Sequence, residues 1–173
     1  MNSIFTICFN LVPDNDLIWL QYRTLHRILG TKSLLYKMSK SDSNLCCNCA
    51  LVEETIEHLF YYCSKVKNLL SELYSRLRPL TGCLYDFDIE DVLLGIIKRS
   101  DYSEPLNILI LILKSYIFEA SRQGHALNIN ALLYKIKKIY LEQEYLANLK
   151  SQLPNFQRKW ALVNDLILAS SFP

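Results

Sequence analysis

Turn-forming residues are scarce in this chain of 173 residues, which contains only four Gly and five Pro. A β-sandwich or β-barrel needs many tight turns, so the composition excludes a many-stranded fold. A transmembrane helix is excluded because the longest apolar run, residues 106–113, contains Asn107 and meets Lys114. A disordered chain is also excluded, since 51% of the residues are hydrophobic and 12% are aromatic. Long helices joined by short connections fit this composition best.

The sequence also lacks a secretory signal and a strong excess of either charge. No Lys or Arg precedes the apolar stretch within residues 1–12, and Asn10 interrupts that stretch. We therefore expect an intracellular protein, in the cytoplasm or nucleus, that is neither secreted nor bound to a membrane. The formal net charge of +2 is too small to indicate a nucleic-acid-binding protein by itself, so any basic surface must be local.

Apolar residues recur at helical spacing along the chain and predict an all-α fold of six to seven helices. The first predicted helix runs from Asp14 or Asp16 to Gly30, with Arg23 and Arg27 on one face. Its apolar stripe consists of Ile18, Tyr22, Leu25 and Leu29. Residues 106–118 are apolar on nearly all sides, which is typical of a buried central helix. Further helices are predicted to begin near Ser64, Asp88, Asn128 or Asn130, and after Pro154.

Four of the six cysteines lie in residues 46–63, together with His58. Cys46 and Cys49 have two residues between them, the spacing of a zinc knuckle in which one turn presents two thiolates to a metal. His58 and Cys63 complete a set of three thiolates and one imidazole. This pattern predicts one structural Zn²⁺ held by Cys46, Cys49, His58 and Cys63, at the centre of the helical fold, with no open position for catalysis.

Helix geometry constrains how the last ligand reaches the metal. Residues five apart on an ideal α-helix point about 140° apart. Cys63 is therefore expected at or beyond the end of the short helix that presents His58. Thr55 is placed to cap this short helix, and the next helix follows directly at Ser64.

The remaining cysteines have simpler interpretations. Cys46 suits the two-residue knuckle spacing better than Cys47, which leaves Cys47 as a spare thiol. Cys8 and Cys83 stand alone and are interpreted as small apolar residues. The alternative for the whole cluster is a set of ordinary buried thiols with a core histidine, but the order and spacing of the four ligand types favour a metal.

This segment resembles a known family. LQYRTLHRIL at residues 20–29, LCCNCA at 45–50 and ETIEHLFYYC at 54–63 are similar to the zinc-binding region of non-LTR (LINE-type) retrotransposon reverse transcriptases, which lies beyond the polymerase thumb. The residues that match the family's Cys-Cys-His-Cys pattern are Cys46, Cys49, His58 and Cys63. The resemblance implies a C-terminal piece of a larger element, with RNA or DNA and the rest of a reverse transcriptase as partners.

We expect one cooperative unit, in which residues 14–80 could form a semi-independent subdomain, and we divide the chain into three regions. Residues 1–13 would be an N-terminal segment of unrelated read-through sequence, residues 14–80 the helix and zinc knuckle, and residues 81–173 a helical region packed on it. The paired aspartates of a polymerase palm have no counterpart. The acids Asp86, Asp88, Glu90 and Asp91 are close in sequence, and they are interpreted as the acidic start of a helix and not as a metal site. We therefore expect no enzyme activity.

Local cations suggest where nucleic acid would bind. The candidate residues are Arg23, Arg27, Lys32, Lys37, Lys65 and Lys67. Neutralising backbone phosphates with these side chains predicts weak, sequence-tolerant binding. Side chains available for stacking on bases are Tyr22, Tyr36, Tyr61 or Tyr62. The alternative is a zinc-stabilised helical domain for protein interaction or scaffolding, in which the same cations form solvated helix faces.

Overall fold

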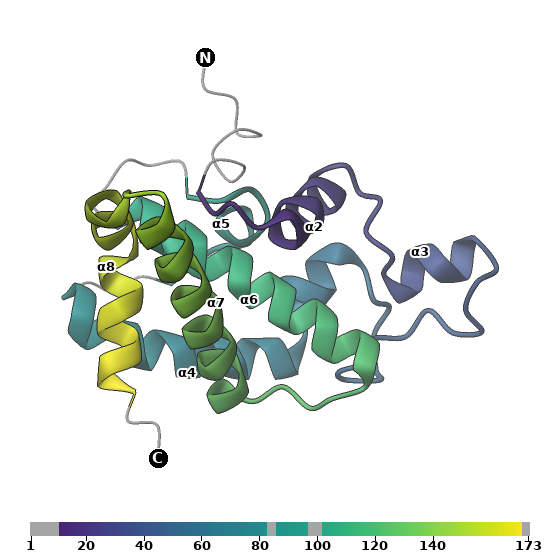
Figure 1. The fold of residues 1–173 in the computed structure, drawn as a ribbon. Helices are drawn as coiled ribbons and strands as arrows, with labels where there is room; N and C mark the ends of the chain where they lie inside the picture. The colour runs from purple at the N-terminus through teal and green to yellow at the C-terminus, as the bar shows by residue number, and fades with distance from the viewer. Residues whose placement is uncertain (1–10, 83–85, 97–101, 171–173) are drawn as a thin grey trace.

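The structure is a computed structural model of the chain that describes residues 11–82, 86–96 and 102–170 (Figure 1). Within these ranges the fold is all-α, with seven α-helices, one π-helical segment and no β-strand. This confirms the predicted fold class. The interpretations of Cys8 and Cys83, and the first ten residues of the predicted N-terminal segment, lie outside the described residues.

The helix boundaries follow from capping side chains. The helical elements are α2 (Asn15–Leu25), α3 (Lys32–Lys37), η2 (His58–Tyr62), α4 (Ser64–Thr81), α5 (Ile89–Leu94), α6 (Ser103–Gln123), α7 (Ile129–Leu149) and α8 (Leu153–Ala169). Asp14 and Asn128 cap α2 and α7 by accepting hydrogen bonds from backbone N–H groups. Asp88 and Asp91 form a capping box at α5, which confirms their interpretation as a helix start. Pro154 lies inside the first turn of α8, where its missing N–H is tolerated.

Helix α6 runs through the middle of the molecule (Figure 1) and packs against α2, η2, α7 and α8. Its residues 106–117 are all buried, as the sequence predicts. One hydrophobic core contains residues from both 14–80 and 81–173, and it includes Leu11 and Val12 from the predicted N-terminal segment. None of the helices in the described ranges has the length and apolar character needed to cross a membrane.

The predicted buried stripe of the first helix is wrong except at Leu29, which is buried but lies beyond the end of α2. Ile18 and Leu25 are only half-buried. The helix buries Leu17, Leu20, Gln21 and Thr24 instead, and leaves Tyr22 at the surface. Gln21 is buried because its carboxamide has two polar partners. Its Nε2 donates to the carbonyl oxygen of Leu93 at 3.0 Å, and its Oε1 accepts a hydrogen bond from the buried Lys114 ammonium group. These partners outweigh the cost of burying an amide.

The first helix is also shorter than predicted, because it ends at Leu25 and does not reach Gly30. Arg27 takes a left-handed conformation, with φ of 57°. The backbone N–H of Arg27 donates to the carbonyl oxygen of Thr24 at 3.2 Å. The N–H of Ile28 donates to the carbonyl oxygen of Arg23 at 2.9 Å. These two bonds form a Schellman motif, which terminates the helix. Arg23 and Arg27 therefore do not share a helix face.

Candidate metal centre

The first two predicted ligands, Cys46 and Cys49, lie on a tight hairpin of residues 45–53 between α3 and η2. The backbone N–H of Cys46 donates to the carbonyl oxygen of Val52, and the N–H of Ala50 donates to the carbonyl oxygen of Cys46, both at 2.8 Å. Ala50 closes the turn in the left-handed region, with φ of 56°. This turn brings the sulfur atoms of Cys46 and Cys49 toward the same point, as the two-residue spacing predicts.

The other two ligands are joined by the π-helical segment η2. Thr55 Oγ1 accepts the N–H of His58 at 3.1 Å, which confirms Thr55 as the predicted cap. The N–H of Cys63 then bonds the carbonyl oxygen of His58 at 2.9 Å, closing one wide turn. Cys63 itself has extended φ and ψ and serves as the N-cap of α4. The prediction that Cys63 lies beyond the helix end is confirmed.

The ligand atoms of Cys46, Cys49, His58 and Cys63 all lie within 4.8 Å of one another. The sulfur atoms of Cys46 and Cys63 are 3.9 Å apart, and the Cys49 sulfur is 3.3 Å from His58 Nε2. Bond lengths of about 2.3 Å to sulfur and about 2.0 Å to nitrogen give edges of about 3.8 Å and about 3.6 Å in a zinc tetrahedron. The four residues thus have the spacing needed to bind a metal ion.

The environment of the Cys63 sulfur favours negative charge. Backbone N–H groups of Asn48 and Cys49 point to the Cys46 sulfur, and those of Lys65 and Val66 point to the Cys63 sulfur. The hydrogen bond from the Cys46 thiol, aided by these N–H groups and opposed by burial, lowers the pKa of Cys63 to about 5. The same bond, together with burial, raises the pKa of Cys46. Backbone donors of this kind stabilise the thiolates that a metal requires.

A buried carboxylate, Glu54, holds the hairpin in place and was missed by sequence reasoning. Its Oε2 accepts the N–H of Cys47 at 3.0 Å and the hydroxyl of Ser121 on α6 at 3.2 Å. Its Oε1 accepts the N–H of Lys32, at the start of α3, at 2.9 Å. Glu54 is only 3% exposed. No local spacing could reveal this role, because the partners are distant in sequence.

Four of the six candidate nucleic-acid-binding residues are exposed, and none of the four forms an ion pair with a carboxylate among the described residues. Arg23 lies on α2, Lys37 at the end of α3, and Lys65 and Lys67 on the first turn of α4. Lys67 Nζ lies 5.9 Å from the centre of the Tyr62 ring. These residues come from three different helices, so the surface is discontinuous along the chain.

The other two candidates are engaged within the protein. Arg27 forms an ion pair of 2.6 Å with Glu57, next to the ligand His58. Burial raises the pKa of the Glu57 carboxyl, but its own backbone N–H and the Arg27 guanidinium lower it more, so it lies below its usual range. Lys32 is half-buried, and its backbone N–H donates a hydrogen bond to the Glu54 carboxylate.

An exposed aromatic row on α2 was also missed. The rings of Trp19 and Tyr22 are 5.5 Å apart, and those of Tyr22 and His26 are 4.2 Å apart. The side chain of Arg23 shares this helix face by its position in the sequence. Tyr22 is one of the side chains that the sequence offers for stacking, although the same residue also fits the predicted buried stripe. Its neighbours Trp19 and His26 do not stand out from the sequence, even at their spacing of three and four residues.

A polar cleft of about 480 Å³ lies beside the knuckle, between the start of α4 and the loop from α6 to α7. Its lining includes Lys65, Asn68, Glu72 and His125. Asn48 also lines it, and the Nδ2 atom of Asn48 is buried without a hydrogen-bond partner among the described residues. Buried amide donors normally have an acceptor, and an ordered water is a common one.

A comparison of the chain with protein-family models, curated proteins and solved structures finds no match. The function is therefore inferred from the geometry and chemistry of the site itself.

Proposed function

We propose that the chain is a zinc-binding, nucleic-acid-binding accessory module, similar to the C-terminal region of non-LTR retrotransposon reverse transcriptases, with no catalytic activity of its own. The observation that carries this proposal is the closed set of Cys46, Cys49, His58 and Cys63. Three sulfur atoms and one nitrogen at tetrahedral distances suit Zn²⁺ better than harder ions. The four protein ligands leave no position for substrate, so the metal's role is to stabilise the fold.

The nucleic-acid part rests on the side chains around the knuckle. Lys37, Lys65 and Lys67 are exposed and can meet phosphate groups. The aromatic row of Trp19, Tyr22 and His26 offers ring faces on which bases can stack.

A second candidate function is a zinc-stabilised scaffold for protein interaction. Its support is the ion pair between Arg27 and Glu57, which commits one of the candidate cations to the fold. In this alternative the metal holds η2 and the hairpin together, and the exposed cations only keep the surface hydrated.

Fluorescence anisotropy with labelled RNA and DNA distinguishes the two candidates. We expect binding at roughly micromolar affinity or weaker at physiological salt, with log K falling against log salt at a slope of about −3 to −4 on duplex DNA. The test variant replaces Lys37, Lys65 and Lys67 together by Gln. The matched control replaces Arg78, Lys138 and Arg158 by Gln, which removes the same charge from cations paired elsewhere with carboxylates.

The proposal expects the test variant to lose most of its binding while circular dichroism shows it folded, and expects the control to bind like wild type. Equal losses in both variants would mean that only net charge matters. Unchanged binding in the folded test variant would favour the scaffold.

A further inference from the structure

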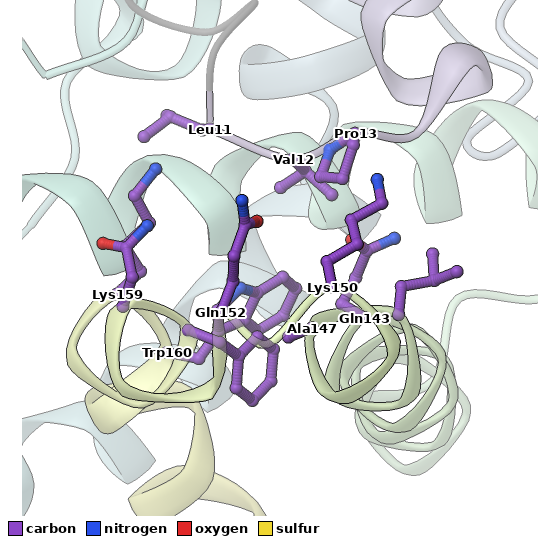
Figure 2. A pocket seen from close by; sticks show the side chains of 12 residues that line it. Leu11, Val12, Pro13, Gln143, Ala147, Lys150, Gln152, Lys159 and Trp160 are labelled. Atoms are coloured by element: carbon purple, nitrogen blue, oxygen red, sulfur yellow. The ribbon is translucent and has the colours of Figure 1, made fainter.

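A second pocket lies far from the metal ligands in the sequence, where the start of the described chain meets the α7–α8 hairpin (Figure 2). Its volume is about 360 Å³, within the range of pockets that bind small organic ligands. Leu11, Val12 and Pro13 form one wall. The hairpin is closed by Ser151 in the left-handed region, with φ of 54°.

The pocket is positively charged. Lys150 and Lys159 line it on opposite sides of Gln152, as Figure 2 shows, and no Asp or Glu is among its lining residues. Neither lysine forms an ion pair within the described part of the chain. Gln152 and Asn155 belong to the start of α8, where backbone N–H groups favour an anion. Two ammonium groups beside a helix N-terminus suit a phosphate.

The rest of the lining suits a flat aromatic body. Phe156 and Trp160 are stacked, with ring centres 5.5 Å apart, and both line the pocket. Gln143 of α7 lines it too and is only 7% exposed. No hydrogen bond ties the Gln143 carboxamide to another described residue, and as a lining side chain it can bond a ligand inside the pocket. A nucleobase edge offers the donor and acceptor pair that a Gln side chain can match.

We infer that this pocket binds a nucleoside monophosphate unit, with the phosphate between Lys150 and Lys159 and the base near Gln143 and the Phe156–Trp160 stack. The unit could be a free nucleotide or the phosphorylated end of a single strand, because both present the same chemistry. The inference is independent of the proposed nucleic-acid surface at the knuckle, which uses other residues.

Calorimetry of the full chain with AMP tests the inference. AMP is expected to bind with a Kd below about 1 mM, and adenosine and inorganic phosphate are each expected to bind at least about tenfold more weakly. Lys150→Ala and Lys159→Ala should each weaken AMP binding about fivefold or more. The matched control, Lys138→Ala on α7 outside the pocket, should bind AMP like wild type. Gln143→Leu should weaken binding of AMP but not of inorganic phosphate.

Two further measurements show where AMP binds and whether the natural ligand is a free nucleotide or a strand end. Trp19→Phe leaves Trp160 as the single tryptophan of the two in the chain, so AMP should change its fluorescence. A 5′-phosphorylated oligonucleotide that competes with AMP and binds more tightly identifies a strand end, whereas weaker binding identifies a free nucleotide. Absence of AMP and oligonucleotide binding, or binding that Lys150→Ala and Lys159→Ala leave unchanged, would overturn the inference. The Lys37, Lys65 and Lys67 variant should still bind AMP, which separates this result from the proposed function.

Discussion

The backbone N–H of Cys63 donates a hydrogen bond of 2.9 Å to the carbonyl oxygen of His58, five residues earlier. This bond makes the turn between the two ligands π-helical and turns Cys63 back toward the imidazole. An α-helical turn would point these side chains about 140° apart. The metal site and the helix irregularity are therefore two aspects of one feature, since π-helical turns are rare and commonly occur at functional sites.

Removal of the metal should loosen the site locally. Without a metal, Cys46, Cys49, His58 and Cys63 lose the bonds that hold the hairpin to η2, and ligand binding energy is folding energy in such sites. We expect a strong chelator to lower the melting temperature and to speed amide exchange in the hairpin, η2 and the first turns of α4. Exchange in α7 and α8 should change least. Hydrogen exchange with and without chelator measures this, and a uniform change along the chain would contradict it.

The Glu54 carboxylate should be important for stability. Glu54→Gln replaces one acceptor oxygen by a donor that faces other donors, so we expect a loss of about 2–4 kcal/mol in the free energy of unfolding. The exposed Glu72 is a matched control, and Glu72→Gln should change stability by less than about 0.5 kcal/mol. Urea denaturation of both variants measures this. Equal stability of the two variants would show that the Glu54 hydrogen bonds contribute nothing.

Tyr74 of α4 should make stability depend on alkaline pH. Its hydroxyl accepts the N–H of Phe87 at 3.0 Å, and burial raises the pKa of Tyr74 above its usual range. A raised pKa means that the folded state holds the phenol proton more tightly, so this stability is present below about pH 10 and is lost as pH rises.

Tyr74→Phe should therefore lower the free energy of unfolding by about 1–2 kcal/mol at neutral pH, where it leaves the Phe87 N–H without this acceptor. The difference from wild type should narrow above about pH 10. Denaturation curves at several pH values check this, with Tyr134→Phe at an exposed position as the control. A difference that stays constant with pH would contradict the account.

The chain alone should have no polymerase or nuclease activity. Among the described residues the cluster able to hold a metal supplies four protein ligands, which leave no open coordination position for a substrate. Primer-extension and nicking assays with Mg²⁺ or Mn²⁺ test this expectation. Activity that persists through further purification would reveal a catalytic centre that the account lacks.

The sequence predicted those features that depend on local spacing. The ligand set followed from the spacing of Cys46, Cys49, His58 and Cys63, and the central helix followed from its continuous apolar residues. The buried face of α2 could not be predicted, because Gln21 is buried only through its bonds to Leu93 and Lys114, which are distant in sequence.

The end of the first helix and the role of Glu54 could not be predicted from the sequence either. The end of the first helix was predicted at a glycine, but the chain turns at Arg27, a residue that rarely takes the left-handed conformation. Glu54 contacts α3, the hairpin and α6 at once, and only the folded chain brings these together. In each of these cases the conformation depends on partners that are distant in sequence and not on local propensity.

The most direct test of the account is metal analysis of the purified chain and two single variants, Cys47→Ser and Cys63→Ser. Cys63 lies inside the ligand cluster, whereas Cys47 is exposed, and its backbone N–H is bound by Glu54. We expect one Zn²⁺ per chain in wild type and in Cys47→Ser, and a loss of the bound metal in Cys63→Ser. A wild-type protein without metal, or retention of full zinc by Cys63→Ser together with its loss from Cys47→Ser, would contradict the assigned site.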